Sequence, residues 1–268
     1  MHSLLPILIP AVFGLCIGSF LNVCIYRMPL GRSITLPSSR CFACGLVLPW
    51  WRNIPVFSWL AQRGRCGCGM VKLTARYPLV EILTAIWFTA VWHFHGHEIP
   101  LAAIHTAFGC ALIVAAFIDI DHFIIPDEIS LGGCLAGLLA GALYPQLHAV
   151  HSWWGGLGLS LVGLLTGGGG LLIIAIIGRV IMKKDAMGMG DVKLLGAMGA
   201  FLGWDAVIFI IASASMIGAS FGLSMILVHR RRWGVPIPFG PYLVIGAMIW
   251  ILGGSEWMAA YWDAVSVR

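Results

Sequence analysis

Long, uninterrupted apolar runs dominate this chain of 268 residues and restrict it to very few folds. Hydrophobic residues make up 60% of the sequence and charged residues 10%, whereas soluble domains carry about 25% charged residues. In lipid, only α-helices and closed β-barrels satisfy all of their backbone polar groups. A barrel requires short segments of alternating polarity, and the runs here are continuous. The sequence therefore predicts an all-α polytopic membrane protein.

A helix needs about 20 apolar residues to cross a bilayer, and on that criterion we expect about eight transmembrane helices. They cover residues 4–26, 79–95, 101–118, 129–147, 157–181, 191–203, 206–228 and 236–254. The sixth would rise only about 20 Å as a helix, so we expect its first residues to dip into the bilayer edge. The glycines at 167–170, inside the fifth span, predict close packing against another helix.

Basic residues are confined to one side of this predicted bundle. With eight spans, 15 of the 16 Lys and Arg residues fall in loops on the same face, which the positive-inside rule makes cytoplasmic. Because these residues flank membrane spans, they indicate contact with lipid head groups and argue against nucleic-acid binding. The expected parts are a first transmembrane helix, a cytoplasmic loop, a seven-helix membrane domain and a short non-cytoplasmic tail, at residues 1–26, 27–78, 79–254 and 255–268.

Two close cysteine pairs lie in the cytoplasmic loop, namely Cys41 with Cys44 and Cys66 with Cys68. Two such pairs about twenty residues apart are typical of a four-cysteine structural zinc site. The second pair has one spacer residue in place of the usual two, and that residue is a flexible glycine. A cytoplasmic position disfavours stable disulfides. A redox-active dithiol and unligated thiols are the alternatives.

Asp119 and Asp191 are the two acids that structural roles explain least well. Asp119 is the first acid after the apolar run from Leu101, at the C-terminal end of a helix, where an anion is disfavoured. Asp191 follows the segment MGMG at the start of the sixth span. With eight spans both residues reach the cytoplasmic side at similar depth, where a buried carboxylate pair would share one proton. Such a pair is suited to acid–base hydrolysis of a peptide bond, and Asp191 could also cap its helix.

Four further residues are candidates for positioning a substrate. Gly188 and Gly190 would let the chain turn tightly and leave room for an extended peptide. Asp127 follows Pro126 at the start of the fourth span, where capping the helix is the alternative role. Glu81 lies one turn into the second span, and its alternatives are an interfacial position or an ion pair with Arg76.

Taken together, these segments resemble the bacterial type IV prepilin peptidases, the bifunctional leader peptidase/N-methyltransferases of the GxGD aspartyl protease family. The resemblance covers nearly the whole chain. It is carried by GSFLNVCIYRMP (18–29), CFACG through RNIPVFSWLAQRGRC (41–66), ARYPLVE (75–81), IDIDHFIIPD (118–127), MGMGDVKLLGAMGAFLG (187–203) and IPFGPYL (237–243).

The resemblance implies a multi-pass enzyme of the bacterial inner membrane. Such an enzyme removes the basic leader from type IV prepilins or pseudopilins after a glycine, then methylates the new amino terminus with S-adenosylmethionine. The family's catalytic aspartates fall on Asp119 and Asp191, and its zinc ligands fall on Cys41, Cys44, Cys66 and Cys68. We expect the basic leader to be bound by acids near this site, with Asp121, Asp127, Glu128 and Asp185 as candidates.

Three other functions are compatible with parts of the sequence. A presenilin-like protease is disfavoured because Asp119 follows Ile118 and not a tyrosine. A proton-coupled membrane transporter would use intramembrane acids without cutting a peptide. A zinc-stapled scaffold without catalysis would leave Asp119 unexplained.

Overall fold

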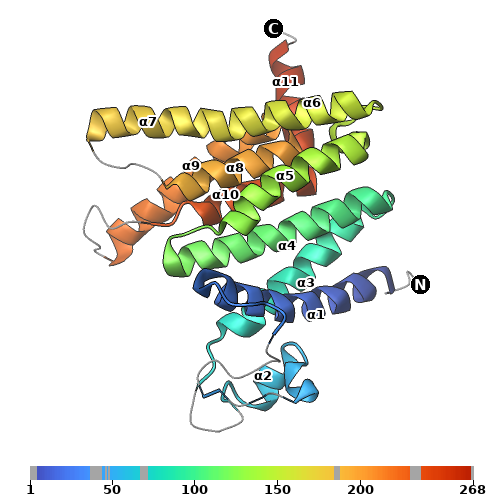
Figure 1. Cartoon of the computed structure of the whole chain (residues 1–268), viewed down its shortest axis with the longest axis vertical. Helices are drawn as coiled ribbons and strands as arrows, with labels where there is room; N and C mark the ends of the chain where they lie inside the picture. The colour runs from blue at the N-terminus through green and yellow to red at the C-terminus, as the bar shows by residue number, and fades with distance from the viewer. Residues whose placement is uncertain are drawn as a thin grey trace. The chain divides into compact units, whose positions relative to one another are not determined.

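The computed structural model describes residues 5–36, 44–45, 47, 49–66, 72–183, 188–229 and 237–266. Within those ranges every regular element is a helix (Figure 1), and isolated bridge residues such as the pair Arg65 and Lys72 form no strand. The predicted all-α fold is therefore confirmed. The chain divides into two compact units, residues 1–114 and 115–268.

The first unit is built from a long N-terminal helix, a loop that contains three short helices, and a second long helix. Its elements are α1 (Leu5–Arg27), η1 (Met28–Leu30), η2 (Trp50–Asn53), α2 (Phe57–Ala61), α3 (Arg76–His95) and the first part of α4 (Ile99–His122). Helix α1 packs directly on α3. A Cβ on Gly14 or Gly18 would lie 2.6 or 2.7 Å from the Cα atoms of Ala85 and Glu81, so only glycine allows this approach.

The second unit contains the end of α4 and a bundle of further helices. Its elements are α5 (Asp127–Leu143), η3 (Pro145–His148), α6 (Trp153–Leu164), η4 (Leu165–Gly169), α7 (Gly170–Met182), α8 (Met189–Leu202), α9 (Trp204–His229), α10 (Gly240–Ile249), η5 (Trp250–Gly254) and α11 (Ser255–Ser266). The element η4 is a single π-helical turn that joins α6 to α7. One continuous apolar segment thus forms the predicted fifth span.

Five helical stretches in the described part of the chain are long and apolar enough to cross a membrane. They are Leu5–Leu30, Ile99–His122, Trp153–Ile181, Trp204–Met225 and Gly240–Val265. Helices also occupy the other three predicted positions. However, α5 and α8 have 17 and 14 residues, and α3 includes Arg76, Glu81 and two histidines. A multi-pass membrane protein is therefore supported, while the count of eight spans stays a prediction.

The helix of the last predicted span breaks close to its expected end at residue 254. The backbone of Leu252 and Gly253 is not helical. Beyond this break a second helix, α11, runs to Ser266. Gly253 has φ of 125°, a conformation that glycine adopts readily and other residues rarely adopt. The break in the apolar pattern therefore coincides with a break between two helices at Gly253.

Helix α8 forms the core of the second unit. Every residue from Asp191 to Phe201 except Lys193 is buried, and α8 packs against α5, α6, η4 and α9 (Figure 1). The neighbouring helices approach α8 closely because their glycines lie directly against its backbone. A Cβ on Gly163 of α6 would collide with the carbonyl of Gly199, and one on Gly167 of η4 would collide with the carbonyl of Leu195. The predicted close packing of the 167–170 segment is confirmed for Gly167.

We expect Gly163→Ala to destabilise the second unit, because the added methyl group has no space beside α8. Overpacking of this kind costs about 1–3 kcal/mol, which corresponds to a drop of roughly 2–10 °C in the apparent Tm of a protein of this size. Thermal unfolding in detergent measures it. The matched control is Gly158→Ala on the same helix, where nothing lies within 4 Å of the added Cβ. Equal Tm values for both variants would contradict the packing described here.

Candidate active site

The structure brings Asp119 and Asp191 close together in the second unit. Asp119 lies in the last turn of α4, and Asp191 is the third residue of α8. Their residues are 6% and 9% exposed, and the charge of Asp119 acts directly on the carboxyl of Asp191. Two buried carboxylates that act on each other in this way cannot both ionise at low cost. Their use in catalysis stays a prediction.

Asp119 is held by the first residue of α10. The backbone N–H of Gly240 donates a buried hydrogen bond of 3.0 Å to Asp119 Oδ2. A Cβ on Gly240 would lie 2.7 Å from the same oxygen, so a side chain at this position would require the carboxylate of Asp119 to shift. Sequence reasoning did not assign Gly240 to the site. Its signal was the segment IPFGPYL, which counted only toward the family resemblance.

Asp191 has a different environment from Asp119. One side of its carboxyl group accepts a backbone hydrogen bond from Gly188, the N-cap of α8. This bond satisfies a free amide at the helix start, so the capping role expected of Asp191 is present. The other oxygen, Oδ1, is buried and has no hydrogen-bond partner among the described residues. An unpaired buried carboxyl oxygen is costly in a folded protein.

An apolar side chain links the two parts of the site. Ile125, in the segment between α4 and α5, is 8% exposed. A Cβ built on Gly190 would lie 3.2 Å from Ile125 Cβ, and one on Gly240 would lie 3.4 Å from Ile125 Cδ1. The close packing against Ile125 is therefore one reason for a glycine at position 190, in addition to its proposed contact with substrate. Ile125 keeps the surroundings of both carboxylates apolar.

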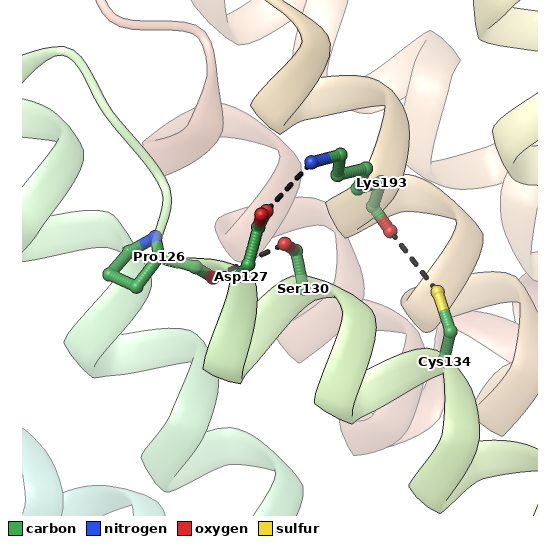
Figure 2. A network of polar contacts seen from close by, with 5 residues as sticks. All are labelled: Pro126, Asp127, Ser130, Cys134 and Lys193. Carbon is green, nitrogen blue, oxygen red and sulfur yellow. Dashed lines mark hydrogen bonds and ion pairs between the residues drawn. The ribbon is translucent and has the colours of Figure 1, made fainter.

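Asp127 contacts Lys193, two residues beyond Asp191 on α8. Lys193 Nζ and Asp127 Oδ1 are 2.7 Å apart, and Cys134 Sγ donates to the Lys193 carbonyl at 3.6 Å (Figure 2). The predicted capping role of Asp127 is wrong: Pro126 is the N-cap of α5, which has no side-chain cap hydrogen bond. Asp127 is instead the first residue of the helix, where the helix dipole favours an acid. The ion pair offsets the charge of Asp127, which makes it a weaker candidate for binding a basic leader.

Glu81 lies in the first unit, where it connects the loop of that unit to the long helices α1 and α3. Its residue is 7% exposed on α3, and Oε2 accepts a hydrogen bond of 2.7 Å from the backbone N–H of Val56. The side chain also accepts a hydrogen bond from Ser19 of α1. Burial argues against the interfacial role considered for Glu81. These partners give it a task in holding the loop, independently of any substrate.

The described cysteines of the two predicted zinc-binding pairs lie next to each other. Cys44 Sγ and Cys66 Sγ are 3.4 Å apart, and two thiolates on one tetrahedral zinc ion lie about 3.8 Å apart. Cys41, Cys68 and Asp185 lie outside the described residues. Within the described ranges, no group of three or more metal-ligating side chains is present. The distance fits a shared metal ion, and the complete ligand set stays a prediction.

These features define a class: a multi-pass helical membrane protein in which two buried aspartates lie at helix ends. The chain belongs to the type IV leader peptidase family, whose model matches residues 106–223. Residues 12–94 match the bacterial peptidase A24 N-terminal domain. Because this is a family of aspartic peptidases, the protein is an enzyme of that class.

Relatives along most of the chain carry the name prepilin leader peptidase/N-methyltransferase. The protein from Myxococcus xanthus is 41% identical over 82% of this chain and 63% of its own length. Those from Stutzerimonas stutzeri and Pseudomonas aeruginosa are each 32% identical, over 95% and 97% of this chain and 93% and 94% of their own lengths. No solved structure matches the chain.

We expect Glu81→Leu to loosen the loop of the first unit, because the half-buried amide of Val56 would lose its acceptor. Hydrogen–deuterium exchange in the peptide covering residues 49–66 should become about tenfold faster. Glu256→Gln, at an exposed position on α11, is the control and should leave this peptide unchanged. Unaltered exchange in Glu81→Leu would show that the carboxylate does not hold the loop.

Proposed function

We propose that this enzyme removes the basic leader peptide from type IV prepilins or pseudopilins after a glycine and then N-methylates the new amino terminus. The observation that carries the proposal is the buried carboxylate pair formed by Asp119 and Asp191. The names of the relatives supply the substrate class and the second activity. Cleavage would occur at the cytoplasmic face of the inner membrane, where the positive-inside rule puts both aspartates.

The carboxylate pair would hydrolyse the peptide bond with one proton between the two groups. The ionised carboxylate takes a proton from a water molecule while the oxygen of that water attacks the scissile carbonyl carbon. At the same time the protonated carboxyl group gives its proton to the carbonyl oxygen. The tetrahedral diol then collapses. The first carboxyl group protonates the departing amine, the C–N bond breaks, and the second carboxylate recovers a proton from the diol. Both groups thereby return to their starting states.

The position of the pair suits a pilin precursor. Such a substrate would present a basic leader in the cytoplasm, followed by an apolar helix in the membrane, with the scissile bond between them. The apolar surroundings of Asp119 and Asp191, including Ile125, limit competing water. Gly188 and Gly190 precede Asp191 and would let an extended substrate backbone approach it.

Methylation is assigned to the same chain and uses a methyl group supplied by S-adenosylmethionine. We place the methyl transfer at the cytoplasmic loop, residues 27–78, with the adjoining helix ends. A structural zinc ion held by Cys41, Cys44, Cys66 and Cys68 would stabilise a loop that has little apolar core of its own. The short distance between Cys44 and Cys66 supports this ligand set.

We expect Asp119→Asn and Asp191→Asn each to lower leader removal by about 10³-fold, because either change removes one half of the acid–base pair. Mass spectrometry of a prepilin incubated with purified enzyme, with and without S-adenosylmethionine, separates loss of the leader from gain of one methyl group. Both variants should still methylate a synthetic pilin peptide that lacks the leader. The exposed control Glu256→Gln should retain both activities.

Cleavage that survives either asparagine substitution would mean that the pair is misassigned. An inactive but folded wild type, tested on several prepilins, would favour the transporter or the scaffold. Ion flux in liposomes then distinguishes these two, because a proton-coupled transporter loses flux in the same asparagine variants and a scaffold shows none.

For the metal, we expect about one zinc ion per purified chain, as a four-cysteine site holds one ion. Cys44→Ser and Cys66→Ser should lower the zinc content measured by plasma mass spectrometry and lower methylation more than cleavage. The exposed Cys16 provides the control Cys16→Ser, which should keep both zinc and methylation. Equal loss of the two activities, with loss of the folded protein, would point to general unfolding and contradict a role confined to the loop.

A further inference from the structure

A histidine-rich turn joins α3 to α4 in the first unit. Four of the nine histidines of the chain, His93, His95, His97 and His105, lie in or beside it. Helix α3 begins shortly after the cysteine loop and runs for 20 residues to this turn, a rise of about 30 Å. By the positive-inside rule the turn is expected on the non-cytoplasmic side. The proposed cleavage and methylation use none of these histidines.

Two of the four histidines face each other. The rings of His95, the last residue of α3, and His105, near the start of α4, have centroids 4.9 Å apart and are inclined at 72°. Zinc–nitrogen bonds of about 2.0–2.1 Å bring the centroids of two imidazole rings on one ion to about 4.5–5.2 Å, for ligand angles between about 90° and 109°. The observed spacing therefore suits two histidines that bind the same metal ion.

His105 is a buried polar side chain that lacks a partner for one of its ring nitrogens. Its residue is 7% exposed, and Nδ1 has no hydrogen-bond partner among the described residues. Buried polar atoms without a partner are uncommon and cost free energy. A neutral imidazole nitrogen is also a good metal ligand. A metal ion on His105 would therefore remove this cost.

We propose that His95 and His105 form a metal site for a divalent transition-metal ion, with zinc as the probe, separate from the predicted cysteine site. The turn supplies a third ligand in Glu98. Its backbone N–H donates a hydrogen bond of 2.9 Å to the carbonyl oxygen of His95, which keeps this acid beside the histidine pair. Imidazole, carboxylate and water are all ligands that zinc accepts. The ion would tie the end of α3 to the start of α4.

An edge-to-face pair of rings can have the same spacing without a metal ion, so zinc binding is the property to measure. His93 provides a matched control. It is exposed, lies two residues before His95 on the same helix, and lines a groove with Pro6 and Ile7 of α1. Residues two apart on a helix point in nearly opposite directions. Removal of His93 therefore leaves the proposed site intact.

For the test, the full chain is purified in detergent without a histidine tag and dialysed against micromolar zinc. Plasma mass spectrometry then gives the zinc content. We expect His95→Gln and His105→Gln each to hold about one zinc ion less per chain than wild type, and His93→Gln to match wild type. Glu98→Gln should need about tenfold more zinc for the same occupancy, because it removes a charged ligand. The comparison is with wild type, so it holds whatever the cysteine pairs bind.

Hydrogen–deuterium exchange locates the bound ion. Zinc should slow exchange about tenfold in the wild-type peptide covering residues 90–105, and should not slow it in His95→Gln. His95 is half-buried, so His95→Gln carries the test even if His105→Gln fails to fold.

Equal zinc contents in wild type and His95→Gln would overturn the proposal. An equal loss in His93→Gln would also overturn it, because zinc would then bind exposed histidines in general. Wild-type zinc affinity in Glu98→Gln would remove the carboxylate from the ligand set. Prepilin cleavage does not enter these measurements, so failure of the proposed function would leave their outcome unchanged.

Discussion

The close packing of α8 is the constraint on which the second unit depends. The helix has only 14 residues, yet its neighbours bury nearly all of it. Lipid provides no hydrophobic force that would hold one helix against another, so contact between backbones must supply the attraction. Glycines at 163 and 167 allow that contact. Because Asp191 lies at the start of α8, the packing that holds this helix also determines where its carboxylate lies.

The candidate active site combines three segments that are distant in the sequence. Asp119 comes from the end of α4, Asp191 from the start of α8, and the Gly240 amide from the start of α10. Helix ends are suitable for holding buried carboxylates, because their terminal backbone N–H groups have no hydrogen-bond partner within the helix. An apolar bundle would otherwise tolerate few polar groups. Here the unused amides of two helices meet the carboxylates that we propose carry out the cleavage.

The first unit follows a different design. Its loop has little apolar core, and two of its described contacts are a hydrogen bond between Val56 and Glu81 and a sulfur contact between Cys44 and Cys66. Such a loop depends on a few specific bonds and not on the burial of a large surface. A division of labour in which the membrane bundle cleaves and the loop supports methylation agrees with this contrast. It also explains why Glu81, which is buried and acidic, need not belong to the carboxylate pair.

The sequence by itself determined the helical membrane fold, the approximate position of every long helix, and the identity of Asp119 and Asp191 as the unusual acids. The fold and the helix positions follow from composition. The two acids stand out because a carboxylate next to an apolar run costs free energy whatever the tertiary structure is. Only the tertiary structure decided the partners: Gly240 on Asp119, Lys193 on Asp127 and Val56 on Glu81. A backbone amide carries no side-chain signal, and an ion pair 66 residues apart depends on how helices pack. For that reason these contacts could not be read from the order of the residues.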